Sequence, residues 1–415
     1  MTDTTYLIIG GSAAGMAAAH TIRQLDPDGA LTVLSDEPEA PYFRPLIPLL
    51  VSGKKDAADM AMNGAGPYRE AGISIHTGCR AEKVQLPERT VVLNNGHTIA
   101  FEKVLFATGS RPYIPPDLAG ADAPGVFALR TLEDARNMTM RLEKTRHAVM
   151  LGGGLLNLKA AFALLEKGVK VTLAVRSPEI LSQLMEPEDT GRIRSALDAA
   201  GLTVMTGLSV KGIVADSRGV TGVALNDGRE LPCEMVCIGK GVRPNVEFLK
   251  GSGIQTDGGI VADIHTACNL ADTFTAGDVA VTHDPMSGDR IMTALWTNAV
   301  EMGRCAGRNM ADFPTAYTGT FGVLNATQVA DEPFVSMGTV HVTESDLEVH
   351  RSRTDSAYRK IVFNQTGDRL IGALFSGDIT NAGLYRYVIR EKMPVSSFKQ
   401  HLVDHTLHYG HLAMA

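Results

Sequence analysis

Two stretches of the sequence decide the fold: YLIIGGSAAGMAAAHTI at residues 6–22 and HAVMLGGGLLNLKAAFALL at residues 147–165. Each begins with an apolar run rich in β-forming residues, which is typical of a buried parallel strand. Each run breaks at glycine and continues into an alanine- and leucine-rich segment, which predicts a helix. Such a turn lets a diphosphate approach the N–H groups at the start of the helix. Two turns in one chain predict two dinucleotides, and the commonest reason to hold two is electron transfer between them.

Length and composition limit the class of protein. A chain of 415 residues suggests two or three domains, and 44% hydrophobic with 20% charged residues is typical of a globular α/β protein. The net charge of −7 and the lack of a basic run argue against a nucleic-acid surface. No apolar stretch approaches the roughly 20 residues of a membrane helix. The first strand starts by about Tyr6, which leaves no room for a signal peptide, so we expect a soluble cytoplasmic protein without a membrane partner.

The cysteines favour structural roles. None of them forms a CxxC motif, and Cys233 and Cys237 flank and enter an apolar strand, where alternation makes a shared metal unfavourable. We therefore expect free, buried thiols in a reducing compartment and no metal site. The five cysteines are Cys79, Cys233, Cys237, Cys268 and Cys305.

The first dinucleotide site continues beyond its glycine turn. The strand at residues 31–34 ends in Ser35, Asp36 and Glu37, about twenty residues past Gly15. A dinucleotide fold places a carboxylate at this point on the ribose hydroxyls, so Asp36 is the predicted ribose ligand. The proline-rich, apolar residues 42–50 should pack over a ligand or another domain rather than form a long helix.

Six motifs occur in an order that resembles a known family. GGSAAG, PYFRP, ATGSRP, GGGLL, GVRPN and TFTAGDVA follow one another along nearly the whole chain. The sequence thereby resembles the pyridine-nucleotide flavoprotein reductases, in the branch of rubredoxin and ferredoxin reductases, nitrite-reductase flavin domains and NADH oxidases. The resemblance implies an α/β fold with two Rossmann-like domains and a C-terminal α+β interface domain, which typically makes a homodimer. The implied domains are FAD-binding at residues 1–117 and 246–320, NAD(P)-binding at 118–245, and interface at 321–415.

The resemblance also implies individual roles. Asp278 matches the carboxylate on the ribityl chain of FAD, Arg130 matches an arginine that contacts FAD, and Trp296 matches the position beside the flavin ring. Trp296 could equally belong to the core. The complete predicted set for FAD is Gly10, Ala13, Ala14, Gly15, Asp36, Arg44, Ala81, Thr108, Gly109, Arg130, Asp278 and Trp296. The set for NAD(P) is Gly152, Gly154, Leu155, Arg176 and Gly239.

Ser52 is the first departure from the relatives. Thiol-dependent relatives carry a cysteine beside the flavin, in the sequence LSCG, where this chain has Leu50, Val51, Ser52 and Gly53. Serine cannot cycle through a sulfenic acid or a disulfide. The sequence therefore predicts electron transfer without a redox-active cysteine.

Lys159 is the second departure. Several ferredoxin reductases pair a lysine with a glutamate near the flavin, but here Leu49 stands at the lysine position and Lys159 at the glutamate position. We interpret this as a cation that has moved across the site, where it stabilises the reduced, anionic flavin. Lys159 is therefore the predicted catalytic residue, and the alternative is a side chain that reaches solvent.

The second glycine turn is the third departure. Asn157 replaces the glycine needed for close helix–strand packing, and the strand at residues 170–175 ends in Val175 and Arg176 instead of a glutamate. An arginine at this point resembles the NADPH pattern, in which a guanidinium binds the 2′-phosphate. NADH, NADPH and a nicotinamide site that binds poorly all remain alternatives.

The last third of the chain alternates in period two with Asn/Gly turns, which predicts an antiparallel sheet followed by a helix near residues 379–393. His401, His405 and His408 are spaced four and three apart, as on one helical face, but Gly410 breaks the helix and no cysteine converges there. We expect these histidines to lie at a solvated or interface surface.

Together these patterns predict an FAD-dependent NAD(P)H oxidoreductase that exchanges electrons with an iron or iron–sulfur protein of the rubredoxin or ferredoxin type. Two alternatives are an NAD(P)-reducing flavin subunit of a larger iron–sulfur complex, like that of phenylglyoxylate-type 2-oxoacid dehydrogenases, and a flavin-loaded scaffold or sensor. The motifs leave the direction of electron flow open.

Overall fold

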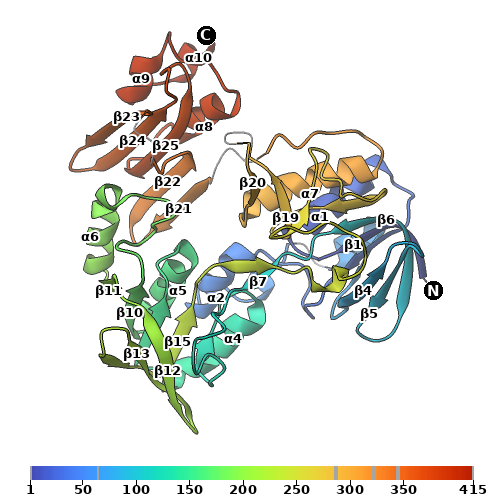
Figure 1. The fold of residues 1–415 in the computed structure, drawn as a ribbon, viewed down its shortest axis with the longest axis horizontal. Helices are drawn as coiled ribbons and strands as arrows, with labels where there is room; N and C mark the ends of the chain where they lie inside the picture. Colours follow the sequence, from blue (N-terminus) through green and yellow to red (C-terminus); the bar gives the residue numbers. More distant parts are fainter. Residues whose placement is uncertain (1, 63–64, 285–287, 320–323, 343–345, 414–415) are drawn as a thin grey trace. The chain divides into compact units, whose positions relative to one another are not determined.

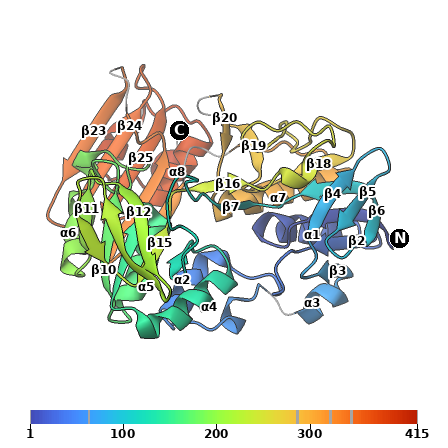
Figure 2. The same cartoon turned by 60° about the horizontal axis from the view of Figure 1, so that its bottom comes forward.

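The chain forms two compact units in a computed structural model, which describes residues 2–62, 65–284, 288–319, 324–342 and 346–413. The first unit comprises Met1–Tyr113, Arg130–Leu132 and Gly241–Thr320, and the second comprises Ile114–Leu129, Glu133–Lys240 and Phe321–Ala415 (Figures 1 and 2). Each unit is therefore built from segments far apart in the sequence. The predicted boundaries between FAD, NAD(P) and interface domains stay a prediction.

The first unit is a sheet-and-helix domain. Its helices are α1 (Ala13–Leu25), α2 (Ile47–Val51), α3 (Ala65–Glu70) and α7 (Trp296–Met310). Its strands are β1 (Thr2–Ile9), β2 (Leu31–Leu34), β3 (Ile73–His76), β4 (Ala81–Gln85), β5 (Thr90–Leu93), β6 (Thr98–Phe106), β7 (Ser110–Pro112), β16 (Val242–Pro244), β17 (Ile260–Val261), β18 (Thr273–Thr275), β19 (Ala280–His283) and β20 (Arg290–Met292). Residues 42–50 form no long helix, as predicted.

The main sheet of this unit has the order β3-β2-β1-β6-β5-β4, and β18 also pairs with β6. β3, β2, β1, β6 and β18 run parallel, whereas β5 and β4 are antiparallel additions to β6. The alternation of β1 separates two cores: Tyr6 and Ile8 pack with the helices, while Leu7 and Ile9 pack under the antiparallel strands. The predicted parallel strand at residues 6–9 is thus buried on both faces.

Helices α1 and α7 lie in close contact because small residues face each other. A Cβ added to Gly303 of α7 would lie 2.1 Å from the carbonyl oxygen of Ala14, and one added to Gly307 would lie 2.7 Å from that of Ala18. The glycines are four residues apart and therefore share one face of α7. This approach brings the middle of α7 against the first two turns of α1.

The second unit contains three further sheets, of which the smallest has the order β12-β13-β14. Its helices are α4 (Leu132–Arg141), which starts in the first unit, α5 (Leu155–Leu165), α6 (Gly191–Ala199), α8 (Ala382–Arg390), α9 (Lys399–Val403) and α10 (Tyr409–Ala413). Its strands are β8 (Val126–Phe127), β9 (His147–Leu151), β10 (Lys170–Val175), β11 (Thr203–Thr206), β12 (Val210–Asp216), β13 (Gly219–Leu225), β14 (Glu230–Pro232), β15 (Met235–Ile238), β21 (Asn325–Val329), β22 (Glu332–Gly338), β23 (Glu348–Arg353), β24 (Ala357–Phe363) and β25 (Leu370–Gly377).

The central sheet of the second unit has the order β11-β10-β9-β15-β8 and is parallel throughout. β9 therefore has β10 on one side and β15 on the other, so the carboxyl ends of all three strands meet at one edge. The C-terminal sheet has the order β21-β22-β25-β24-β23 and is antiparallel, as the alternation predicted.

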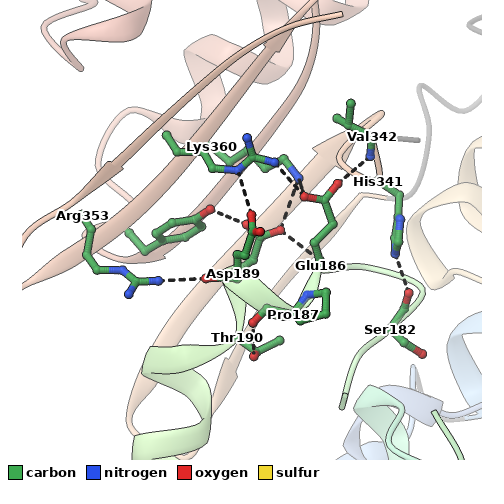
Figure 3. Close-up of polar contacts among 12 residues, drawn as sticks. Ser182, Glu186, Pro187, Asp189, Thr190, His341, Val342, Arg353 and Lys360 are labelled. Carbon is green, nitrogen blue, oxygen red and sulfur yellow. Dashed lines mark hydrogen bonds and ion pairs between the residues drawn. The ribbon is translucent and has the colours of Figure 1, made fainter. Parts of the chain in front are cut away.

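A buried cluster of charges joins the segment before α6 to the C-terminal sheet (Figure 3). The Nζ atom of Lys360, a fully buried residue, lies 2.7 Å from the carboxylate of Glu186 and 3.4 Å from that of Asp189. The Tyr358 hydroxyl also donates to Asp189, and Arg192 pairs with Glu332 at 2.6 Å. Because a buried charge is costly without a partner, this network ties α6 and the segment before it to the C-terminal sheet.

Candidate functional site

The first glycine turn has the geometry of a dinucleotide cradle. Gly10 has φ +126°, and a Cβ there would lie 2.0 Å from the carbonyl oxygen of Ala107 at the end of β6. Only glycine fits such an approach. Ala13 and Ala14 open α1, which has no acidic residue in its first turn and no side-chain hydrogen bond from its N-cap, Ser12. The first turn of the helix is therefore suited to an anionic ligand.

Arg44 organises the polar groups around this turn. Its Nε atom donates to the Ser12 hydroxyl at 3.0 Å, and its Nη1 atom donates to the Tyr42 hydroxyl at 3.0 Å and to the Arg130 carbonyl at 3.2 Å. Its Nη2 atom pairs with Glu37, which also accepts from Tyr42. The PYFRP segment is thus tied to the glycine turn and to the end of β2.

Arg130 and Asp278 meet at the same site. The Nη2 atom of Arg130 donates to Oδ2 of Asp278 at 2.8 Å, and the Ser110 hydroxyl donates to the same oxygen at 2.9 Å. Asp278 follows Gly277, whose added Cβ would lie 3.0 Å from the Cβ atom of Ala14. The predicted arginine and carboxylate are therefore brought together beside the start of α1.

Thr108 and Gly109 form the adjoining wall. The Thr108 hydroxyl donates to the carbonyl of Asn245 at 2.8 Å, and the Asn245 amide returns a hydrogen bond to the Thr108 carbonyl at 2.9 Å. Gly109 adopts φ +64° and lies beside the Arg130 guanidinium. This pair of hydrogen bonds joins the residues that flank the paired strands β7 and β16 within the first unit.

The start of α7 contributes two further groups. Trp296 is the first residue of α7 and packs, partly buried, on the helix-side core, with its ring centroid 5.8 Å from that of Phe43. Asn298 is only 4% exposed, and its amide Nδ2 has no hydrogen-bond partner among the described residues. A buried unpaired amide is costly, so Asn298 fits a site that a polar ligand completes.

Two predicted FAD residues lie apart from these contacts. Asp36 is exposed, whereas the neighbouring Glu37 takes part in the Arg44 network. Ala81 begins β4 and packs in the core under the antiparallel strands. The roles of both residues at FAD stay predictions.

The second glycine turn repeats the first. Gly152 has φ +108°, and its added Cβ would lie 2.4 Å from the carbonyl oxygen of Gly239, which follows β15. Asn157 is buried, and its amide Nδ2 donates to the carbonyls of Leu151 and Gly152, both at 2.9 Å. Asn157 therefore replaces a glycine without opening the turn, because its amide pairs with the carbonyls at the end of β9.

Several predicted groups surround this turn. Gly154 is the N-cap of α5 and provides no side-chain cap, Leu155 begins the helix, and its first turn has no acidic residue. Arg176 is exposed directly after β10. The nearby Glu179 is paired with Arg194 at 3.2 Å, so its carboxylate is already engaged.

Lys159 lies in α5 and is partly buried. Burial lowers its pKa, and its ammonium has no ion-pair or hydrogen-bond partner within the described ranges. The predicted unpaired cation is therefore present in the structure, whereas its catalytic role stays a prediction.

Four of the five cysteines lack the character of redox thiols, and the expected burial holds for Cys233, Cys237 and Cys305, whereas Cys79 and Cys268 are half-buried. All five are free, and burial raises the pKa of Cys233, Cys237 and Cys268 to about 12 and that of Cys305 to about 11. Reactive cysteines have lowered pKa values instead. Ser52 lies at the end of α2, where its hydroxyl donates to the carbonyl of Leu49 at 3.1 Å.

The C-terminal histidines do not share one helical face. α9 ends at Val403, the His401 ring stacks on His411 with centroids 3.8 Å apart, and the His408 ring is tilted against His411 with centroids 3.7 Å apart. His405 is instead packed against Tyr385. In the described ranges, no group of three or more histidines, cysteines or carboxylates is arranged to hold a metal ion, and no helix is long and apolar enough to cross a membrane.

Two glycine turns, each between a parallel strand and a helix whose first turn lacks acidic residues, define a protein that binds two dinucleotides. Residues 4–303 match the pyridine nucleotide-disulphide oxidoreductase family, and the chain belongs to that family. It is an oxidoreductase that uses FAD and NAD(P)H, which confirms the predicted family, enzyme class and cofactors.

Three curated relatives show the range of similar proteins. The NADH-dependent phenylglyoxylate dehydrogenase subunit epsilon of Aromatoleum evansii is 28% identical over 415 residues, which cover 99% of this chain and 97% of that one. The 3-phenylpropionate/cinnamic acid dioxygenase ferredoxin–NAD(+) reductase component of Photorhabdus laumondii is 27% identical, over 75% of this chain and 78% of its own. The rubredoxin-NAD(+) reductase of Ectopseudomonas oleovorans is 26% identical, over 71% and 76%.

Solved structures confirm the fold class. The ferredoxin reductase for the CYP199A2 system from Rhodopseudomonas palustris superposes with a TM-score of 0.89, covering 99% of this chain and 100% of that chain at 23% identity. The reductase in a covalent putidaredoxin reductase–putidaredoxin complex has a TM-score of 0.86 at 21% identity, over 98% and 99%. The predicted α/β fold with two dinucleotide-binding regions and a C-terminal α+β region is therefore confirmed.

The sequence patterns did not identify every group at these sites. Tyr42 lies in the PYFRP motif, Glu37 follows the predicted ribose ligand Asp36, and Asn298 lies two positions after Trp296, but no spacing rule distinguishes them. Lys240 is a fourth such residue, and it lies directly after Gly239. Lys240 draws attention only in the folded chain, where Gly239 packs against the second glycine turn.

Proposed function

We propose that this protein transfers hydride between NAD(P)H and FAD, and electrons between FAD and an iron–sulfur protein, without a cysteine relay. The observation that carries the proposal is Ser52, together with four cysteines of raised pKa, three of them buried and one, Cys268, half-buried. FAD, when bound, supplies the redox chemistry, because it can exchange both hydride and single electrons.

The protein's own residues have binding and electrostatic roles in this proposal. The start of α1, including Ala13, Ala14 and Gly15, would hold the FAD diphosphate. Asp278 would bind the ribityl chain while Arg130 holds its carboxylate in place. The start of α7, with Trp296 and Asn298, would lie against the flavin ring.

Relatives support an iron–sulfur partner. Two of those described above are named as reductases of ferredoxin and rubredoxin, and one solved neighbour is a complex with putidaredoxin. We infer that electrons leave across the flavin to a docked protein of this kind. A cytoplasmic location and a homodimer through the C-terminal sheet are part of the same proposal.

A second candidate is a flavin subunit of a larger 2-oxoacid dehydrogenase complex. The specific observation in its favour is coverage: the phenylglyoxylate dehydrogenase subunit matches 99% of this chain, whereas the ferredoxin and rubredoxin reductases match 75% and 71%. Co-purification from the native host under anaerobic conditions separates the two candidates, because the second predicts stably bound iron–sulfur subunits.

The first test is anaerobic stopped-flow mixing of the FAD-loaded protein with NADH or NADPH. Loss of the visible absorbance of the oxidised flavin is the expected result. No loss with either nucleotide would leave the scaffold or sensor alternative, which the intact turn around Asn157 disfavours. Rapid reoxidation by a rubredoxin or ferredoxin, faster than by oxygen, is expected in the second mixing step.

A further inference from the structure

Lys240 is a half-buried cation at the edge of the second glycine turn. It directly follows Gly239, whose carbonyl oxygen packs against Gly152. No residue that the structure describes forms a hydrogen bond or an ion pair with its ammonium. A positive charge in this position carries an electrostatic cost that a bound anion would remove.

Arg176 flanks the same turn from the other side. It directly follows Val175, whose side chain would lie 3.1 Å from a Cβ added to Gly153. Among the described residues its guanidinium likewise has no hydrogen-bond or ion-pair partner. Because β10 and β15 are the two neighbours of β9, Arg176 and Lys240 lie on opposite sides of the strand that enters the turn.

The two cations also influence each other. Burial lowers the pKa of Lys240, the positive charge of Arg176 lowers it further, and the carboxylate of Asp117 opposes the shift as the smallest of the three influences. The edge around the N-terminus of α5 is therefore positive on both sides and has no acidic residue in the first helical turn. This arrangement favours a ligand that carries two separate anionic groups.

We propose that Arg176 and Lys240 form a two-point clamp for NADPH, in which Lys240 binds the diphosphate and Arg176 binds the 2′-phosphate of the adenosine ribose. The assignment follows from the topology. In such a fold the diphosphate binds at the helix start after β9, and the adenosine ribose binds at the end of the next strand, β10. Arg176 follows β10 and is therefore placed at the ribose, whereas Lys240 follows β15, on the other side of β9, and is placed at the diphosphate. The inference rests on the proposed function and names its nucleotide.

The test is equilibrium binding of two nicotinamide-free fragments, measured calorimetrically with the FAD-loaded protein. ADP-ribose carries the diphosphate alone, and 2′-phospho-ADP-ribose carries both anionic groups. The native protein should bind the 2′-phosphorylated fragment about tenfold or more tightly, which is the effect of one charge-assisted hydrogen bond. Arg176→Ala should abolish this preference and leave the affinity for ADP-ribose unchanged.

Lys240→Ala should weaken the binding of both fragments by the same factor, again about tenfold or more, and so preserve the preference for the 2′-phosphorylated fragment. Lys240→Arg should retain most of the affinity. Lys167→Ala is the matched control, because Lys167 is exposed beyond the other end of α5 and should affect neither fragment. Flavin content and thermal midpoint show whether each variant is folded.

The outcomes separate the clamp from the proposed function. Equal affinity of the native protein for the two fragments, or unchanged affinities in Lys240→Ala, would overturn the clamp and leave an NADH-dependent reductase intact. A loss of preference in Lys240→Ala would overturn the assignment of the diphosphate to this residue. If the native protein binds neither fragment, the clamp and the nicotinamide half of the proposed function both fail.

Discussion

The guanidinium of Arg130 donates to the carboxylate of Asp278 at 2.8 Å, across 148 positions of sequence. Arg130 comes from the short segment Arg130–Leu132, which belongs to the first unit although its sequence neighbours belong to the second. The pair therefore holds this short segment against the loop in which Gly277 approaches Ala14 at the start of α1. This dual role makes Asp278 a sensitive probe of the FAD site.

Asp278→Ala should weaken FAD binding, because it removes the predicted ribityl ligand and leaves the Arg130 guanidinium without this carboxylate. Hydrogen bonds to charged groups contribute about 1.5–3 kcal/mol, so the dissociation constant should rise about tenfold or more. The dissociation constant is measured from the rise in flavin fluorescence as FAD leaves the protein. Asp278→Asn should lose less FAD affinity, and Glu82→Ala, at an exposed position on β4, should leave the FAD affinity unchanged. Full FAD retention in Asp278→Ala would contradict the assignment.

Ser52→Ala should leave electron transfer from NAD(P)H to an iron–sulfur acceptor unchanged, because no redox chemistry is assigned to this hydroxyl. The variant should lose about 1 kcal/mol of unfolding free energy with the hydrogen bond to Leu49. Steady-state reduction of a rubredoxin, with denaturant unfolding in parallel, measures both. A large loss of electron transfer in the folded variant would mean that position 52 participates in the chemistry.

Lys159→Glu should lower the midpoint potential of the bound flavin, because a negative charge replaces the cation proposed to stabilise the reduced, anionic ring. Lys159→Met should give an intermediate value. Spectroelectrochemical titration measures the midpoint potential. Lys167→Glu, which makes the same charge change just beyond the C-terminal end of α5, is the control. An unchanged potential in a folded, flavin-loaded Lys159→Glu variant would rule out the electrostatic role.

Acid should destabilise the second unit through Glu186. Burial alone would raise the pKa of this carboxyl, but hydrogen bonds from Lys360, Val342 and Arg351 outweigh burial and lower the pKa to about 2 (Figure 3). A carboxyl with a lowered folded-state pKa contributes stability above its unfolded value of 4.5, and the contribution disappears as the pH falls toward 2.

Glu186→Gln should therefore lower the unfolding free energy near neutral pH and reduce the loss of stability between pH 4.5 and 2. Thermal unfolding across this pH range is the measurement. Glu188→Gln is the matched control, because its side chain is 75% exposed and its nearest cation, Arg351, lies 3.8 Å away. Parallel pH curves for the native protein and Glu186→Gln would show that another group controls the acid transition.

The sequence alone determined the two strand–glycine–helix units, the parallel sheets around them and the antiparallel C-terminal sheet. These features depend on local patterns: an apolar run, a glycine that permits positive φ at Gly10 and Gly152, and period-two alternation. Family resemblance then identified Arg44, Arg130 and Asp278, and the folded chain brings all three to one turn. These features could be predicted because strand alternation, glycine turns and motif positions are properties of short segments of the sequence.

Only the tertiary structure decided how distant residues compensate for one another. Asn157 looked like a defect in the glycine motif, yet its amide closes the turn, and a Cβ on Gly239 would lie 2.2 Å from its side-chain oxygen. Glu37 rather than Asp36 joins the Arg44 network, and Lys240 and Arg176 flank one turn although 64 positions separate their numbers (240 − 176). Strand order and register set these distances, and neither can be read from the spacing of residues along the chain.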